Sequence, residues 1–373
     1  MAKFLCPYCY EMHTKEQCLV TCLYHNTHDA KKVCANDFKK DPSGFVEEKS
    51  KTKCFKCTHT VTRLHCPESK NEIPEDLMIF GGLPIALVGA KASGKSNYIA
   101  VLVNEIKKKM TRHFNCSINM SCADSQKNYN DFYYNPLFKS KKVVGATDAG
   151  EIPPLIFPLQ FMNDKNKITN VATLTFYDTA GENLDSIEDM TVNNKYIPNA
   201  KGIILLLDPL QIESIREKLK EKGMTQLPPI YTDVNEVLSR IVETIRRVKK
   251  INAKKKIDIP LAVTFTKIDA LEKYGILPEG GCLVDESEHI DRGLFVDSEF
   301  SNTSIEMQDL VDNWLSGELE SLMKNFEKYA FFGLTALGNI PNRNDISEIK
   351  PKRVLDPLLW ILAENKFIKR VKN

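Results

Sequence analysis

The sequence of 373 residues has no marked excess of charge of either sign, since 51 Lys and Arg stand against 49 Asp and Glu. Proteins that bind phosphate backbones normally carry a clear positive excess, so nucleic acid is not an expected partner. Long apolar runs are missing too. The first residues, MAKFLCPYCY, contain no apolar leader, and runs such as Ile203–Leu207 are far too short to cross a bilayer. We therefore expect a cytoplasmic protein without a membrane partner.

Aliphatic residues are scarce over the first 75 residues, where cysteines are concentrated instead. This segment holds eight of the 11 cysteines: Cys6, Cys9, Cys18, Cys22, Cys34, Cys54, Cys57 and Cys66. Disulfides are rare in a reducing compartment, and a metal can stabilise a segment that cannot build an apolar core. The Cys-x₂-Cys and Cys-x₃-Cys spacings are typical of structural zinc sites. We predict a zinc-ribbon-like domain over residues 1–75 with two structural Zn²⁺ ions.

The spacing does not decide which cysteines share a zinc ion. Pairing Cys6 and Cys9 with Cys54 and Cys57 gives one ribbon-like site and leaves four cysteines for a second, but interleaved arrangements are equally allowed. A histidine can also replace a thiolate, and the candidates are His13, His25, His28, His59 and His65. Because basic and acidic residues nearly balance in this segment, a protein partner is favoured over a nucleic acid.

From about residue 76 the pattern changes to alternating strands and helices. It predicts an α/β domain over residues 76–373, with a mostly parallel sheet flanked by helices. The expected strands are 84–88, 155–161, 171–177, 202–207, 261–265 and 330–334, and the expected helices are 95–109, 212–222, 233–250, 304–328 and 354–368. The polar link between 155–161 and 171–177 is too short for a crossover helix and predicts an antiparallel hairpin. Residues 113–146 form an insertion whose aromatic residues 132–134 are expected in the core.

A phosphate-binding loop follows the first of these strands. Residues 89–96 read GAKASGKS, which matches G-x-x-x-x-G-K-[ST] between a strand and a helix. Lys95 is expected to reach the β- and γ-phosphate oxygens, and the Ser96 hydroxyl to bind Mg²⁺. The residues expected to enclose the β-phosphate are Gly89, Ala90, Lys91, Ala92, Ser93 and Gly94.

Three further segments follow strand candidates. In Asp178-Thr179-Ala180-Gly181 the carboxylate can hold the Mg²⁺ water shell, and the Gly181 N–H can meet the γ-phosphate. In Thr266-Lys267-Ile268-Asp269 the Asp269 carboxylate can accept N–H donors from N1 and the 2-amino group of guanine, a pair that adenine does not present. The Lys267 stem can cover the purine face. Thr335 and Ala336 can offer a backbone N–H to guanine O6.

In this order the segments GAKASGKS, DTAG, TKID and TAL resemble the G1, G3, G4 and G5 motifs of TRAFAC-class (Ras-like) GTPases. The resemblance covers roughly residues 80–372 and implies a P-loop GTPase fold that binds GTP or GDP with Mg²⁺. The long stretch before DTAG and the LLLDP and DPLLW segments, at 205–209 and 356–360, are more similar to bacterial double-GTPase families associated with conflict systems. That likeness implies a bacterial protein acting with a second GTPase or an effector.

Departures from the Ras-like pattern concern hydrolysis. Glu182 follows DTAG where Ras-like enzymes carry the glutamine that orients the attacking water. A carboxylate there can accept a proton from water, but it repels the γ-phosphate, so we expect slow intrinsic hydrolysis. Thr147 is the candidate for the threonine that binds Mg²⁺ in the GTP state, although an ordinary loop threonine is an equal alternative. Lys91 stands where the prototype has glycine, and a solvent-facing lysine is the simpler interpretation.

The sequence thus predicts a Mg²⁺-dependent GTPase with an N-terminal zinc-binding module, working as a switch or an assembly factor for protein partners. The expected catalytic residues are Lys95, Thr147 and Glu182. Two alternatives stay open. One is a scaffold that binds nucleotide without hydrolysing it, and the other is an ATP-dependent P-loop NTPase, which requires the TKID segment to be accidental.

Overall fold

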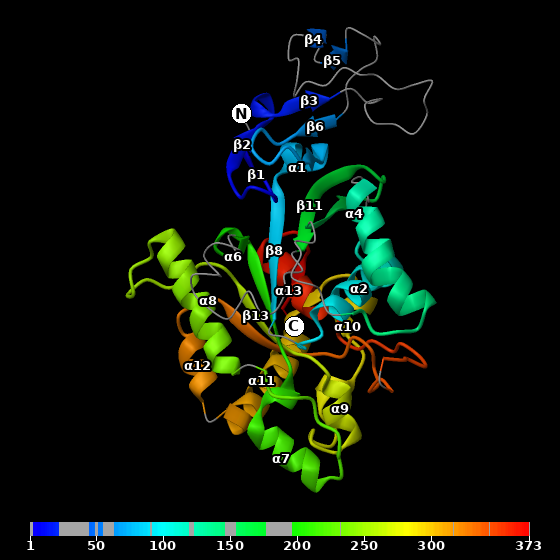
Figure 1. Cartoon of the computed structure of the whole chain (residues 1–373), viewed down its shortest axis with the longest axis vertical. Helices are drawn as coiled ribbons and strands as arrows, with labels where there is room; N and C mark the ends of the chain where they lie inside the picture. Colours follow the sequence, from blue (N-terminus) through cyan, green and yellow to red (C-terminus); the bar gives the residue numbers. More distant parts are fainter. Residues whose placement is uncertain are drawn as a thin grey trace.

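The computed structural model describes residues 3–21, 45–48, 51–54, 63–89, 92–118, 123–145, 154–176, 196–231, 233–315, 317–342 and 344–372. A seven-stranded sheet lies at its centre, in the order β15-β13-β12-β8-β11-β10-β9 (Figure 1). The strands are β8 (Gly82–Gly89), β9 (Cys116–Ile118), β10 (Leu155–Met162), β11 (Ile168–Phe176), β12 (Gly202–Leu207), β13 (Leu261–Phe265) and β15 (Tyr329–Gly333). The five strands from β15 to β11 are parallel.

Two antiparallel strands complete one edge of the sheet. β10 pairs with β11 in the hairpin predicted from the short polar link, which is therefore confirmed. β9, which the sequence did not indicate, pairs with the outer side of β10. The mostly parallel α/β sheet is as predicted, because strands buried on both faces read as continuous apolar runs.

Helices cover both faces of the sheet, and successive residues of β8 point alternately to the two layers. Ile85 and Leu87 belong to one apolar cluster, and Ala86 and Val88 belong to the other. The helices are α2 (Lys95–Glu105), α3 (Thr111–His113), α4 (Ala123–Asn128), α6 (Tyr196–Asn199), α7 (Glu213–Glu221), α8 (Val234–Lys249), α9 (Ile268–Lys273), α10 (Glu288–Arg292), α11 (Asp297–Leu315), α12 (Glu318–Met323) and α13 (Asp356–Glu364).

Two of the predicted helices have different bounds in the structure. The helix expected over 304–328 is two helices, α11 and α12, because Gly317 adopts a left-handed conformation with φ of 75° at the start of α12. The closing helix ends at Glu364 rather than at 368, since the chain then turns into β16 (Arg370–Val371), which pairs with β14 (Phe295–Val296).

The insertion between α2 and β10 packs against the side of α2. After α2 the helix continues as a π-helical segment, Ile106–Met110, and a second π-helical segment, Tyr129–Lys139, follows α4. Of the aromatic cluster in the latter, Tyr133 is buried in the core, as expected, whereas Phe132 is 52% exposed. One side of this helix therefore faces solvent.

Short strands and a sulfur-rich core make up the described part of residues 1–75. The strands are β1 (Lys3–Leu5), β2 (Met12–Thr14), β3 (Leu19–Thr21), β4 (Phe45–Glu48), β5 (Lys51–Cys54), β6 (Arg63–His65) and β7 (Glu72–Ile73). α1 (Glu75–Phe80) links this segment to β8. Cys6, Cys18 and Cys66 are buried beside Leu77 and Met78 of α1. Among the described residues, the structure has no helix with the length and apolarity needed to span a membrane.

Candidate functional site

The predicted phosphate loop lies between the carboxyl end of β8 and the start of α2. Ala92 and Gly94 have left-handed backbones, with φ of 66° and 84°, and Lys95 begins the helix with only 8% of its surface exposed. Ala90 and Lys91 lie outside the described residues. The amino end of α2, with the N–H groups of its first helical turn, therefore lies at the loop.

Glycine is required at the first position of the loop because the chain turns back on itself there. A Cβ added to Gly89 would lie 2.4 Å from Ser93 Oγ and 3.2 Å from the backbone oxygen of Leu206. The Ser93 hydroxyl is buried and has no hydrogen-bond partner among the described residues. A buried hydroxyl donor beside a helix amino end fits an anionic ligand such as a phosphate.

The TKID segment is fastened directly to the phosphate loop. The Thr266 hydroxyl donates to the Ser93 carbonyl over 3.0 Å, and Lys267 Nζ donates to the Ala92 carbonyl over 3.1 Å. Lys267 Nζ also lies 2.6 Å from Oδ2 of Asp208, which is buried at the end of β12. Lys267 therefore reaches over the loop and is held there by a charged partner.

Asp269 is the second residue of α9, next to the segment that follows β15. Burial raises the pKa of the Asp269 carboxyl, and a hydrogen bond with the Thr335 side chain partly opposes that rise. A carboxylate with its remaining acceptor positions in a cavity can bind a ligand that presents two adjacent N–H groups.

These segments surround one cavity of about 750 Å³ at the carboxyl edge of the parallel strands. Its wall includes Ala92–Ser96 of the phosphate loop together with Thr266, Lys267, Asp269, Thr335 and Ala336, all of which the sequence had singled out. Residues that the sequence did not indicate also line it, among them Val143, Val144, Leu210, Met224, Thr225, Gln226 and Pro228. Segments up to about 240 residues apart in the sequence thus face one space.

The other predicted ligands of phosphate and Mg²⁺ lie in the two segments that follow residues 145 and 176 in the chain. Thr147, Asp178, Gly181 and Glu182 lie outside the described residues. Of the described residues that precede them in the chain, 143–145 line the cavity wall, and Phe176 ends β11, which is parallel to β8. The Val144 N–H donates to Asn97 Oδ1 of α2 over 2.9 Å, which fixes this wall to the helix after the phosphate loop.

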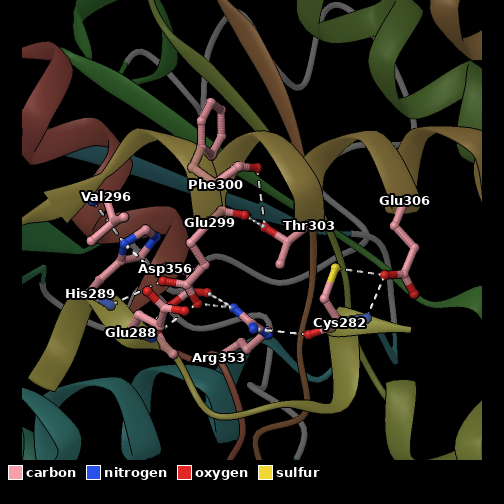
Figure 2. Close-up of polar contacts among 11 residues, drawn as sticks. Cys282, Glu288, His289, Val296, Glu299, Phe300, Thr303, Glu306, Arg353 and Asp356 are labelled. Carbon is pink, nitrogen blue, oxygen red and sulfur yellow. Dashed lines mark hydrogen bonds and ion pairs between the residues drawn. The ribbon is translucent and has the colours of Figure 1, made fainter. Parts of the chain in front are cut away.

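The segment of Thr335 is hydrogen-bonded to a segment that contains Arg353, the centre of a buried ionic network. Figure 2 shows this network. Lys352 and Thr335 exchange two backbone hydrogen bonds, of 3.0 and 3.2 Å. The next residue, Arg353, is buried and donates to Glu299 over 3.0 Å, to Asp356 over 2.9 Å and to the Cys282 carbonyl over 2.9 Å. Burial opposes its charge, but the two carboxylates outweigh burial and raise the pKa of Arg353.

His289, Glu299 and Asp356 bring metal-ligating atoms within 4.8 Å of one another in this network. We interpret the cluster as structural, because the Arg353 guanidinium already supplies the positive charge that faces both carboxylates (Figure 2). Sequence reasoning missed Arg353 and Glu299. They lie 54 residues apart, and neither belongs to a recognisable motif.

Four of the eight predicted zinc ligands have described side chains. Cys6, Cys9 and Cys66 lie together, with their sulfur atoms within 4.8 Å of one another, which is one of the interleaved arrangements. Cys18 is buried nearby and donates to the Thr14 carbonyl over 3.6 Å. Cys54 ends β5, and Cys22, Cys34 and Cys57 lie outside the described residues.

The model of the family described as Double-GTPase 2 matches residues 83–317. A protein of Mycolicibacterium smegmatis named putative ESX-1 scaffolding and assembly protein SaeC is 23% identical over 319 residues, which span 80% of this chain and 79% of that protein.

Solved structures with low overall similarity include two that are bound to GTP. The Saccharomyces cerevisiae Ski7 GTPase-like domain bound to GTP has 15% identity and a TM-score of 0.35, and the match covers 76% of this chain and half of that one. The signal recognition particle receptor SRb-GTP/SRX complex from Chaetomium thermophilum has 13% identity and a TM-score of 0.29, covering 70% of this chain and 94% of that one.

The ionic network generates a stability prediction. Arg353→Met leaves the carboxylates of Glu299 and Asp356 buried without their cation, so we expect the free energy of unfolding to fall by about 3–5 kcal/mol. Urea unfolding of the purified variant measures this change. Lys350→Met removes an exposed partner of Glu348 and should cost less than about 1 kcal/mol. Equal losses in the two variants would contradict the buried network.

Proposed function

The chain belongs to the Double-GTPase 2 family, and we propose that it is a Mg²⁺-dependent GTPase that works as a nucleotide-gated switch in the assembly of a protein complex. The observation that carries this proposal is the single cavity into which the phosphate loop, Lys267, Asp269 and Thr335 all open. One end of that cavity suits phosphates and the other suits a purine base.

At the phosphate end, N–H donors and an ammonium group are proposed to bind the phosphates, and oxygen ligands are proposed to bind Mg²⁺. The N–H groups of the loop and of the first turn of α2 surround the β-phosphate, and the Lys95 ammonium faces the β- and γ-phosphate oxygens. Ser96 follows Lys95 on the cavity wall, where its hydroxyl suits Mg²⁺, a cation that prefers oxygen ligands. Asp178 and Thr147 are the proposed further Mg²⁺ ligands, and Gly181 the proposed donor to the γ-phosphate.

At the base end, the Asp269 carboxylate is placed to accept hydrogen bonds from N1 and the 2-amino group of guanine. The aliphatic stem of Lys267 lies along one wall, where it can cover the purine face while its ammonium stays on Asp208 and the Ala92 carbonyl. Of the two residues expected to face guanine O6, Thr335 already donates its N–H to the Lys352 carbonyl, so the Ala336 N–H is the proposed donor. Adenine offers no adjacent pair of donors to Asp269, so this arrangement favours GTP over ATP.

The proposed reaction is hydrolysis of GTP to GDP and phosphate. Glu182 can take a proton from the attacking water, but its negative charge beside the γ-phosphate opposes the reaction, so hydrolysis without a partner should be slow. The second candidate function, a scaffold that binds GTP without hydrolysing it, is favoured by the same residue. In both cases the γ-phosphate would order the segments that contain Thr147 and Gly181.

Protein partners are the third part of the proposal. A relative that is 23% identical over 319 residues is named as a putative scaffolding and assembly protein, which supports a role in assembling a complex. A second GTPase or an effector is the proposed partner class, the proposed setting is a bacterial defence system, and the proposed location is the cytoplasm. Residues 1–75 are proposed to form a zinc-binding domain, and residues 76–373 the GTPase domain.

Base selectivity tests the GTP assignment. Asp269→Asn replaces one acceptor oxygen by an N–H donor that faces the 2-amino group of guanine, so GTP affinity should fall at least about tenfold, the loss of one charge-assisted hydrogen bond. Xanthosine triphosphate, which carries a carbonyl at C2, should bind the variant better than GTP does. Fluorescent nucleotide analogues with Mg²⁺ measure both affinities, and the exposed Asp291→Asn is the control. Unchanged GTP binding, or ATP binding as tight as that of GTP to the wild type, would contradict the assignment.

The raised pKa of Asp269 predicts a pH dependence. Only the ionised carboxylate accepts both guanine donors, and a raised pKa means that protonation begins at a higher pH than for an exposed aspartate. GTP affinity should therefore be constant at high pH and fall by up to about tenfold per pH unit below the pKa of the free protein. Titrations between neutral pH and the onset of acid unfolding measure it. Asp269→Asn should lack this dependence, and a wild-type profile identical to that of the variant would exclude Asp269 as its source.

The rate of GTP hydrolysis distinguishes a GTPase from a scaffold that binds GTP without hydrolysing it. If Glu182 interacts with the attacking water, Glu182→Gln removes its charge beside the γ-phosphate and should change the single-turnover rate of GTP hydrolysis, while GTP affinity stays within a few-fold of the wild type. Release of phosphate from a protein–GTP complex, with and without candidate partners, gives the rate. Lys95→Ala provides the background value. A wild-type rate equal to that background under every condition would favour the scaffold.

A further inference from the structure

Two turns near the N-terminus have nearly the same structure, although they are 60 residues apart. Each follows a strand, β1 or β6, and begins with Cys-Pro: Cys6-Pro-Tyr-Cys9 in the first turn and Cys66-Pro-Glu-Ser69 in the second. The N–H groups of Tyr8 and Ser69 lie 3.4 Å from the sulfur atoms of Cys6 and Cys66, respectively. The segments lie together at one end of β8 (Figure 1).

The backbone hydrogen bonds repeat in the same order. Tyr10 N–H donates to the Cys6 carbonyl and Lys70 N–H to the Cys66 carbonyl, each over 3.0 Å. The Cys6 and Cys66 N–H groups donate to residues five positions later, over 3.0 and 2.9 Å. Tyr10 and Lys70 both have φ of 62°. Such a turn directs its sulfur and several N–H groups to one point, which is the geometry that a metal-bound thiolate needs.

The two turns differ at their fourth position, where Cys9 corresponds to Ser69. A neutral serine hydroxyl is a poor ligand for a soft-metal site, so the pair of turns alone offers three thiolates. His13 on β2 supplies a fourth donor. Its side chain is 6% exposed, and its Nε2 lies 3.1 Å from Cys9 Sγ and 3.6 Å from Cys66 Sγ.

From this geometry we propose that Cys6, Cys9, His13 and Cys66 together bind one Zn²⁺ ion in a tetrahedral Cys₃His site. Ligand atoms around tetrahedral zinc lie about 3.5–3.8 Å apart, from Zn–S of about 2.3 Å and Zn–N of about 2.0 Å. The Cys9 and Cys66 sulfur atoms are 3.5 Å apart, and all three sulfur atoms lie within 4.8 Å. The inference rests on the proposal that residues 1–75 bind zinc, and it fixes the ligands of one site.

Cys18 is not a ligand of this site. Its sulfur lies 3.6 Å from the Thr14 carbonyl and 3.9 Å from the Met78 sulfur, inside the small apolar cluster that also contains Leu77 of α1. Cys18 therefore packs behind the ligands, between the site and α1.

The zinc site also fixes a contact with the nucleotide-binding part of the chain. Tyr10, which directly follows Cys9, has its ring centre 6.5 Å from that of Tyr196 in α6. Tyr10 packs against the apolar cluster that contains β12 and β13. α6 is the first described element after residues 177–195, the segment that carries DTAG and Glu182. A bound metal would thus hold the turn that contacts α6, the helix that follows this segment in the chain.

Native mass spectrometry of the full-length chain, purified without chelator, tests the ligand set by counting zinc ions per chain. Cys66→Ser and His13→Ala should each hold one zinc ion fewer than the wild type, whatever the other cysteines bind. Ser69→Ala, which keeps all four proposed ligands, should hold as many as the wild type. His13→Cys should keep the ion and, after exchange for Co²⁺, show stronger sulfur-to-cobalt absorption than the wild type because a fourth thiolate replaces an imidazole.

Two results would overturn the proposal: a full zinc count in both Cys66→Ser and His13→Ala, or a zinc-free wild type two mass units lighter, in which Cys9 and Cys66 are joined by a disulfide. If Cys66→Ser does not fold, the zinc counts of His13→Ala and His13→Cys together test the proposal. GTP affinity is measured on the same samples. Zinc loss with GTP affinity retained separates this proposal from the proposed GTPase, because the cavity contains none of these four residues.

Discussion

Lys267 joins the two ends of the candidate site, and the rest of the cavity is arranged around that contact. Its ammonium binds the phosphate loop at the Ala92 carbonyl and the buried Asp208 at the end of β12, while its stem lies beside Asp269. A charged hydrogen bond in a half-buried position is stronger than the same contact in water. Because β8, β12 and β13 are parallel, their carboxyl ends meet at one edge, and a single side chain can reach from one to the next.

The opposite wall is held by a second set of charges, around Arg353. Buried ions contribute little net stability when compared with apolar residues of the same size, but they fix one geometry, because each charge has only one set of partners. Here they keep residues 351–356 beneath the segment of Thr335, which in turn hydrogen-bonds to Asp269. The base end of the cavity is therefore built on rigid elements. The segments that are expected to respond to the γ-phosphate follow Gly145 and Phe176 in the chain.

The sequence predicted those features that depend on local pattern. The parallel strands were visible as apolar runs, and the P-loop, TKID and TAL segments were placed correctly at strand ends, where the structure brings them to one cavity. Features that depend on distant pairs were not predictable. Glu299 and Arg353 carry no motif, β9 is too short to show a period, and the partnership of Cys66 with Cys6 and Cys9 follows from the register of β6 rather than from Cys-x₂-Cys spacing. The sequence offered five histidines as equal candidates, and the structure shows that His13, on β2, lies beside Cys9 and Cys66.

The central claim is that one cavity binds both the phosphates and the base of GTP. A crystal structure of the wild-type protein with Mg²⁺ and a non-hydrolysable GTP analogue tests it most directly. The account predicts guanine N1 and its 2-amino group within hydrogen-bonding distance of the Asp269 carboxylate, the β-phosphate inside residues 89–96, and the Ser96 hydroxyl on the metal. A nucleotide bound elsewhere, or one whose base lies away from Asp269 while its phosphates occupy the loop, would contradict the account.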